Sequence, residues 1–159
     1  MVSSSRIARL SRRSVCGGIF GLAVAPRVLW ANTGVVVYKD PNCGCCDRWA
    51  KHVAAAGFSV RIEEARDLNA VRSLLGVPAD LAGCHTAEAG GYLVEGHVPV
   101  GAISRLLQER PHAAGLAVPG MPAGSPGMDG DPQRYPVILF GPSGRRTYMQ
   151  FLGSQEIGG

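Results

Sequence analysis

The sequence lacks two features that would place the protein in a membrane or on a nucleic acid. It has an apolar stretch at residues 16–25, but this is well short of the roughly 20 residues that a spanning helix needs. Its excess of 16 basic over 12 acidic residues is confined to the start, because residues 1–31 hold five arginines and no acid. The remainder holds eleven basic and twelve acidic residues. No basic surface for nucleic acid is therefore expected there.

Residues 1–31 have the layout of a secretory signal. A basic segment with paired arginines at residues 11–14 precedes the apolar stretch 16–25, and small residues follow up to Ala31. The paired arginines indicate the twin-arginine type. We predict cleavage after Ala31 and export of residues 32–159 as a single domain to a bacterial periplasm. A membrane anchor is the alternative, and the shortness of the apolar stretch disfavours it.

Four cysteines remain after residue 31, and three of them are crowded into one short segment. Cys43, Cys45 and Cys46 follow Pro41-Asn42, and Cys84 follows Gly83. Four cysteines in an oxidising compartment usually form two structural disulfides. Adjacent residues such as Cys45 and Cys46 rarely bridge each other, however, and a structural disulfide does not need three cysteines in one turn. The crowding indicates chemistry instead: disulfide exchange, or binding of a soft metal ion by thiolates.

The hydrophobic pattern predicts alternating strands and helices. The first helix, at about residues 45–56, begins at the cysteine segment, and Asp67 is a candidate cap for the second. A loop rich in Gly, Pro and Met is expected at 115–136. The other expected elements are strands at 35–38 and 59–63, a hairpin from 81–87 and 92–96, a helix after Pro99 that ends before Pro111, and a terminal hairpin from 137–140 and 147–151.

The order β-α-β-α-β-β-α, with Cys-x-x-Cys opening the first helix, is typical of the thioredoxin-like arrangement. The expected fold class is therefore α/β (α+β): a thioredoxin-like mixed sheet flanked by helices, with an added C-terminal β-hairpin. By analogy with that fold, the start of the third strand lies beside the first helix. Cys84 should then join Cys43, Cys45 and Cys46 at one end of the sheet.

Three segments of the chain resemble the CopG-like copper-resistance family, small exported bacterial proteins long catalogued as a domain of unknown function. The resemblance implies a thioredoxin-like fold and a role in copper handling. The family's Cys-x-Cys-Cys maps onto Cys43, Cys45 and Cys46, and its Cys-His pair onto Cys84 and His85. The segments are YKDPNCGCCDRWAKHVAAAGF at 38–58, GVPADLAGCHTAEAGGYLVEGHVPVGAISRLL at 76–107 and GLAVPGMPAGSPGM at 115–128.

The crowded thiols favour copper over zinc. A helix N-terminus stabilises thiolates, and Cys45 and Cys46 should benefit most. These neighbours fit a single tetrahedral zinc ion poorly, whereas thiolates shared among several Cu(I) ions would use them well. We therefore expect a copper–thiolate centre formed by Cys43, Cys45, Cys46 and Cys84. The resemblance to the copper-resistance family implies that such a centre serves copper resistance and homeostasis. The candidate protein partners are a periplasmic copper carrier and a copper exporter.

A redox reading stays open beside the metal reading. Cys43 could attack and Cys46 resolve as the catalytic pair of a thiol-disulfide oxidoreductase, although Cys45 could then form a wrong disulfide. The two readings can coexist, since a dithiol supplies two electrons and copper cycles between Cu(I) and Cu(II). A structural zinc or disulfide domain is a third class.

Further candidate metal ligands lie outside the cysteines. His85 adjoins Cys84 and could supply a nitrogen ligand or a proton partner; a hydrogen bond within the hairpin is the alternative. Met121 and Met128 carry thioethers that suit Cu(I), with core filling as their alternative role. His97 could border the site, but a core or surface position is favoured. The other side chains considered are expected in solvent or in packing: Trp49, His52 and His112.

Overall fold

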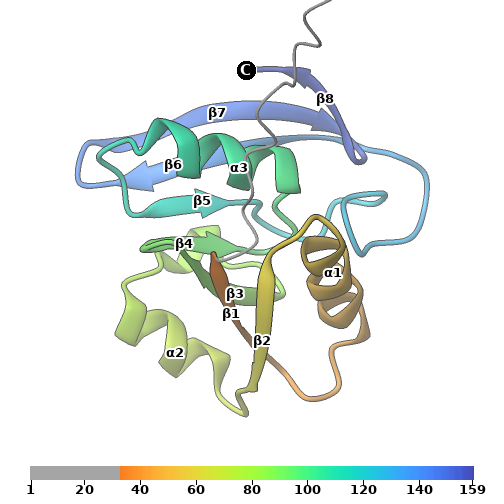
Figure 1. The fold of residues 1–159 in the computed structure, drawn as a ribbon, viewed down its shortest axis with the longest axis vertical. Helices are drawn as coiled ribbons and strands as arrows, with labels where there is room; N and C mark the ends of the chain where they lie inside the picture. The colour runs from red at the N-terminus through yellow and green to blue at the C-terminus, as the bar shows by residue number, and fades with distance from the viewer. Residues whose placement is uncertain (1–32) are drawn as a thin grey trace, which may run out of the picture.

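A computed structural model describes residues 33–159, so the predicted signal peptide at 1–31 lies outside the described residues. This part of the chain forms eight strands, three α-helices and a short 3-10 helix (Figure 1). They are β1 (Gly34–Lys39), α1 (Gly44–Ala55), β2 (Ser59–Glu64), α2 (Leu68–Leu75), η1 (Ala79–Leu81), β3 (His85–Ala89), β4 (Tyr92–Glu95), α3 (Val100–Glu109), β5 (Gly115–Ala117), β6 (Arg134–Gly141), β7 (Gly144–Leu152) and β8 (Gln155–Gly158).

The strands form one mixed sheet in the order β2-β1-β3-β4-β5-β6-β7-β8. Strands β1 and β2 are parallel, as are β4 and β5, and the other neighbouring pairs are antiparallel. In Figure 1, α1 and α2 lie on opposite sides of β1 and β2, and α3 lies across β5 to β7. The predicted mixed α+β class is confirmed. In the described residues, no helix is long and apolar enough to cross a membrane.

The first seven main elements occur in the predicted order, and local signals explain their ends. The Asp67 carboxylate accepts a hydrogen bond from the Ala70 N–H at 3.0 Å, which caps α2 as predicted. Gly76 ends the same helix with a φ of 78°, a backbone conformation that favours glycine. These positions are fixed by neighbours in sequence, which is why pattern alone finds them.

The C-terminal region differs from the prediction. The segment 115–136, expected to be a loop, contains β5 and the start of β6, and β8 was not predicted. Strand β5 is only three residues long and fully buried between β4 and β6, so it shows no alternating pattern. A Cβ at Gly115 would clash with the Leu93 carbonyl oxygen, so this glycine allows the close pairing with β4. Strand β8 is exposed throughout and also lacks a hydrophobic signal.

The main hydrophobic core is shared by α1, α3 and the sheet. Trp49 is fully buried in it, and its indole N–H donates to the Val98 carbonyl at 2.9 Å. The prediction that Trp49 packs the helix against the sheet is confirmed. This packing holds the N-terminus of α1, and with it the cysteine segment, at a fixed place against the sheet. Other fully buried core residues are Val35, Val37, Val53, Val94, Ile103, Leu106 and Leu116.

Candidate metal centre

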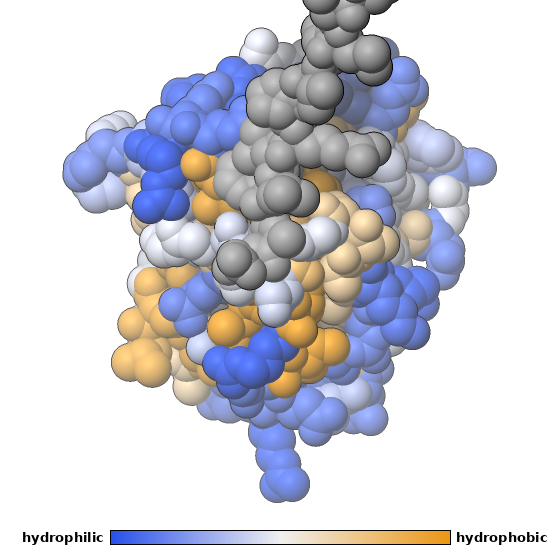
Figure 2. Space-filling view, in the orientation of Figure 1, coloured by the Kyte–Doolittle hydropathy of each residue, from blue (hydrophilic) through white to orange (hydrophobic). Residues whose placement is uncertain are grey.

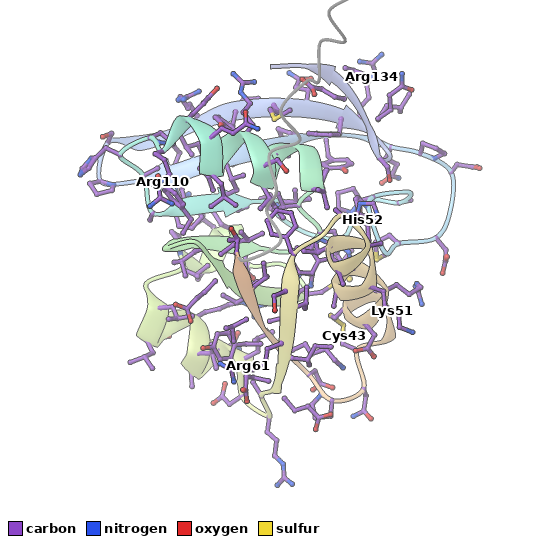
Figure 3. All side chains as sticks on the ribbon, in the orientation of Figure 1. Cys43, Lys51, His52, Arg61, Arg110 and Arg134 are labelled. Carbon is purple, nitrogen blue, oxygen red and sulfur yellow. A yellow bond between two sulfur atoms is a disulfide. The ribbon has the colours of Figure 1, made fainter. Side chains whose placement is uncertain are left out.

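A tight turn joins β1 to α1 and ends at Cys43, which is the N-cap residue of α1, while Cys45 and Cys46 lie in the first turn of that helix (Figure 3 labels Cys43). The Asp40 carboxylate accepts from the Asn42 N–H at 2.8 Å, and the Asp40 carbonyl accepts from the Cys43 N–H at 3.0 Å. Lys39 is 3% exposed, and its Nζ donates to the carbonyls of Asp40 and Pro41 at 3.1 and 3.3 Å. A buried lysine therefore ties this turn to the end of β1.

The fourth cysteine is held by a buried ion pair from other elements. Glu95 on β4 is fully buried, and one carboxylate oxygen accepts from Arg72 Nε at 2.8 Å and from the Gly83 N–H at 2.7 Å. The other oxygen accepts from the Thr86 hydroxyl at 2.6 Å. Arg72 Nη2 donates to the Gly83 carbonyl at 2.6 Å. Both backbone polar groups of the residue before Cys84 are thus bound by this pair.

The fold brings the four sulfurs together as the sequence analysis expected. Their Sγ atoms all lie within 4.8 Å of one another. Cys43 and Cys46 form a disulfide, while Cys45 and Cys84 are free thiols. Cys45 Sγ lies 3.5 Å from Cys43 Sγ and 3.8 Å from Cys84 Sγ. Because Cys46 is fully buried and the other three are partly exposed, the cluster is open on one side.

The environment of Cys84 keeps its thiol protonated in the absence of metal. Burial, together with the neighbouring Cys45 sulfur, raises the pKa of Cys84 to about 12. A thiol must lose its proton to become a metal ligand, so metal binding here releases a proton and competes with it.

His97 is fully buried and borders the cluster, which is the position that the sequence analysis named for it but ranked below a core or surface role. Its Nε2 lies 3.3 Å from Cys84 Sγ, and its Nδ1 lies 2.7 Å from the Pro126 carbonyl. The carbonyl can only accept, so Nδ1 carries the proton and Nε2 turns a lone pair toward the sulfur. Burial lowers the pKa of His97, which favours this neutral form. The predicted hairpin could have indicated this position of His97, because the Gly96 N–H donates to the His85 carbonyl and so brings the residues that follow β4 next to the start of β3.

His85 is fully buried next to the cluster but is not one of the four grouped ligands. Its ring lies 4.2 Å from the Trp49 ring and 5.2 Å from the His97 ring, between centroids. Neither ring nitrogen has a hydrogen-bond partner within residues 33–159, so a hydrogen bond within the hairpin is not its role there. Burial holds the pKa of His85 well below its usual value, and the imidazole is neutral. Its predicted role as a ligand stays a prediction.

The Gly, Pro and Met segment is anchored against the start of α1. Arg48 Nε donates to the Gly127 carbonyl at 2.9 Å, and a Cβ at Gly127 would lie 2.7 Å from the Cys45 carbonyl oxygen. Met121 is 61% exposed, which contradicts the alternative of core filling for this residue. Met128 is partly buried in the anchored part of the segment. A role of either thioether as a ligand stays a prediction.

Comparisons with known proteins show which family this chain is similar to. Residues 81–128 match the family described as protein of unknown function DUF411. Two solved structures of copper resistance protein CopG, Form 1 and Form 2, are 45% identical to this chain with a TM-score of 0.70. The Form 1 match covers 76% of this chain and the Form 2 match covers 75%, and each covers 98% of the CopG chain. No curated protein matches the sequence.

Proposed function

Because the chain belongs to the CopG-like copper-resistance family, we propose that it is a periplasmic copper-binding protein of copper resistance and homeostasis. It binds Cu(I) through the thiolates of Cys43, Cys45, Cys46 and Cys84. The observation that carries this proposal is the approach of all four sulfurs to within 4.8 Å of one another. The periplasmic location rests on the signal-like pattern of residues 1–31. The thioredoxin-like description is supported by the strand order β2-β1-β3-β4 and by Cys-x-x-Cys at the start of α1.

The donor set fits Cu(I) better than a harder ion. Thiolate is a soft ligand that selects Cu(I), and the neighbouring sulfurs of Cys45 and Cys46 can be shared between ions. The disulfide between Cys43 and Cys46 must first be opened. A dithiol reductant, itself oxidised to a disulfide, supplies the two electrons and two protons that convert the Cys43–Cys46 disulfide to two thiols, and those thiols lose their protons when the metal binds. His85, Met121 and Met128 are proposed as further ligands, and His97 joins them because its Nε2 faces Cys84.

The same cysteines support interconversion of copper oxidation states. In the proposed reaction, the Cys43 and Cys46 thiols give one electron to each of two Cu(II) ions. The products are two Cu(I) ions, two protons and the disulfide between these sulfurs. Cys45 and Cys84 are then the free thiols left to bind Cu(I), and the four-thiolate site forms again when the disulfide is reduced. The disulfide in the structure corresponds to the oxidised end of this reaction. The neutral His97 imidazole beside Cys84 is placed to take up a proton that the Cys84 thiol releases. A copper exporter or a periplasmic copper carrier is the proposed kind of partner.

The test is a titration of the reduced protein with Cu(I) against a competing chelator, together with an assay of Cu(II) reduction. The proposal predicts tight Cu(I) binding, and a sharp fall in bound Cu(I) for Cys45→Ser. The matched control is His52→Ala. It removes an exposed imidazole on the same helix, outside the cysteine cluster, and should leave the titration unchanged. A reduced protein that binds no Cu(I) and leaves Cu(II) unreduced would overturn both parts of the proposal.

A second candidate function is thiol-disulfide exchange by Cys43 and Cys46, favoured by the disulfide between them. Cys45→Ser separates the two functions, because it removes a proposed copper ligand and leaves this pair intact. Exchange with a small disulfide should survive or improve in that variant if the protein is a thiol-disulfide oxidoreductase.

Metal analysis of protein from copper-fed cells tests the third function class, a structural zinc or disulfide domain. Zinc alone, at one ion per chain, would indicate a structural zinc site.

A further inference from the structure

Strand β2 is an exposed edge of the sheet whose pattern fits a second copy of itself. It pairs with β1 on one side and ends the strand order on the other in the described residues. Ile62 at its centre is 43% exposed. Figure 2 shows hydrophobic residues gathered in the lower part of the visible face, where Figure 1 places β2 and α2. An unpaired edge of this kind is a template for another strand.

The hydrogen bonds to β1 show which backbone groups face outward. The N–H of Ser59 donates to Thr33 at 3.2 Å, and the N–H of Ala65 donates to Lys39 at 2.8 Å. Backbone groups alternate in direction along a strand, so the odd-numbered residues of β2 face β1. The N–H and C=O groups of Val60, Ile62 and Glu64 therefore point away from the sheet. These three residues form a set that is symmetric about Ile62.

The charges of β2 select one register of antiparallel self-pairing. Centred on Ile62, each Arg61 lies opposite Glu63 of the second copy, at a close pair that lacks backbone hydrogen bonds. Centred one residue earlier, Arg61 would face Arg61; centred one residue later, Glu63 would face Glu63. Both of those registers are destabilised by like charges. Arg61 and Glu63 are exposed and already form an ion pair within the strand, so two copies would join two such pairs into one network (Figure 3 labels Arg61).

The groove beside β2 is complementary to the same register. It has a volume of about 310 Å³ and lies between α1 and β2, with Val60 and Ile62 in its lining and Asp47 and Lys51 of α1 beside them. The Asp47 carboxylate is paired with Lys39 Nζ at 3.1 Å, so Lys51 is the charge of the lining that a second copy can pair with. In the Ile62-centred register, Glu64 of the second copy lies opposite Val60. Directly opposed side chains share a face of the sheet, so this carboxylate reaches the groove that Lys51 lines.

The other edge of the sheet offers no such match. Strand β8 is four residues long and contains one charged residue, Glu156. It has no pair of opposite charges that a second copy could exchange. Self-recognition is therefore specific to β2.

From these observations we propose that the protein forms a two-fold symmetric dimer by antiparallel pairing of β2 with β2, centred on Ile62. The short strand makes the dimer weak and concentration-dependent. The cysteine clusters follow β1, which is parallel to β2, so the two clusters lie toward opposite ends of the paired strands. Dimer formation therefore leaves copper binding per chain unchanged. The dimer proposal and the proposed copper function can be tested independently of each other.

Sedimentation equilibrium of the reduced, metal-free protein over a wide concentration range tests the dimer. Arg61→Glu and Glu63→Arg should each be monomeric, because each variant sets like charges opposite each other. An equimolar mixture of the two variants should dimerise, because every cross-strand pair in the mixed dimer has opposite charges. Glu156→Arg, a charge reversal on the other sheet edge, is the matched control and should dimerise like the wild type.

Three results would overturn the proposal. The first is a wild-type protein that stays monomeric at all concentrations up to the millimolar range. The second is a dimer that persists in both single charge-reversal variants, which would place the interface elsewhere. The third is a mixture of the two folded variants, verified by circular dichroism, that remains monomeric. Copper titration of Arg61→Glu reads the copper function separately, with wild-type stoichiometry expected.

Discussion

The two segments that supply the sulfurs are held in different ways. The segment with Cys43, Cys45 and Cys46 is local: it comprises the end of the turn between β1 and α1 and the start of α1, and the turn is held by Lys39 and Asp40 just before it. The segment with Cys84 is held from a distance, by an ion pair between α2 and β4. The comparison teaches that the motif itself is a property of a short sequence, whereas the complete four-sulfur site depends on a buried tertiary network.

The largest expected effect comes from breaking the distant network. In Glu95→Ala, Arg72 keeps a buried charge without its partner, and Gly83 loses the acceptor for its N–H. Removing one member of a buried pair typically lowers the free energy of unfolding by about 3–5 kcal/mol. Urea unfolding of the reduced protein measures this. Asp129→Ala, which removes the acid of an exposed pair, is the control and should shift stability by less than about 1 kcal/mol. A Glu95→Ala variant as stable as this control would refute the role of the network.

The protonated state of Cys84 distinguishes this segment chemically. At pH 8, a pKa of about 12 instead of 9.0 lowers the thiolate fraction of Cys84 about 1,000-fold. A more basic thiolate is also a stronger nucleophile, which offsets part of the resulting loss in alkylation rate. Alkylation of Cys84 in the metal-free protein with the Cys43–Cys46 disulfide intact should therefore be about 30-fold slower than that of an unperturbed thiol. Its rate should keep rising tenfold per pH unit above pH 9. Peptide mass spectrometry after timed iodoacetamide treatment measures this, and a plateau near pH 9 would contradict it.

Loss of the local anchor should have a smaller effect. Lys39→Met keeps the apolar part of the side chain but leaves the carbonyls of Asp40 and Pro41 without their buried donor. We expect a loss of about 1–3 kcal/mol of unfolding free energy. Lys51→Met, a change at an exposed lysine on α1, is the matched control and should stay within about 0.5 kcal/mol of wild type. Equal stability of the two variants would show that Lys39 does not hold the turn.

The smallest effect is expected where the Met-containing segment meets α1. Arg48 and Asp129 form an ion pair at 3.1 Å, but their side chains are 49% and 91% exposed. Solvent screens such a pair, so Asp129→Asn should change the free energy of unfolding by less than about 1 kcal/mol. Thermal unfolding with and without added salt checks this. A larger, salt-sensitive loss would mean that this segment is held mainly by charge.

The sequence predicted the local parts of this molecule well. The first seven elements, the Asp67 cap and the crowding of three sulfurs all follow from residues close together in the chain. The approach of Cys84 was inferred by analogy with a fold. The short strand β5 and the exposed strand β8 were not predicted, because neither shows a two-residue hydrophobic period.

The parts of the site that were missed depend on tertiary contacts. Arg72 stands among ordinary residues of an amphipathic helix, and Glu95 ends an apolar strand, so neither signals a buried pair. His97 was named as a residue that could border the site but was ranked below a core or surface position, because its place beside Cys84 depends on the register of the hairpin before it. Such side chains gain their roles only when strands and helices are placed against one another.

The most direct test of the central claim is X-ray absorption spectroscopy of the Cu(I)-loaded protein, compared with the same measurement on Cys84→Ser. The account predicts a copper first shell dominated by sulfur, which loses sulfur scattering when Cys84 is replaced. A wild-type shell made of nitrogen and oxygen, or a sulfur shell unchanged in Cys84→Ser, would contradict the claim that both segments together form one copper site.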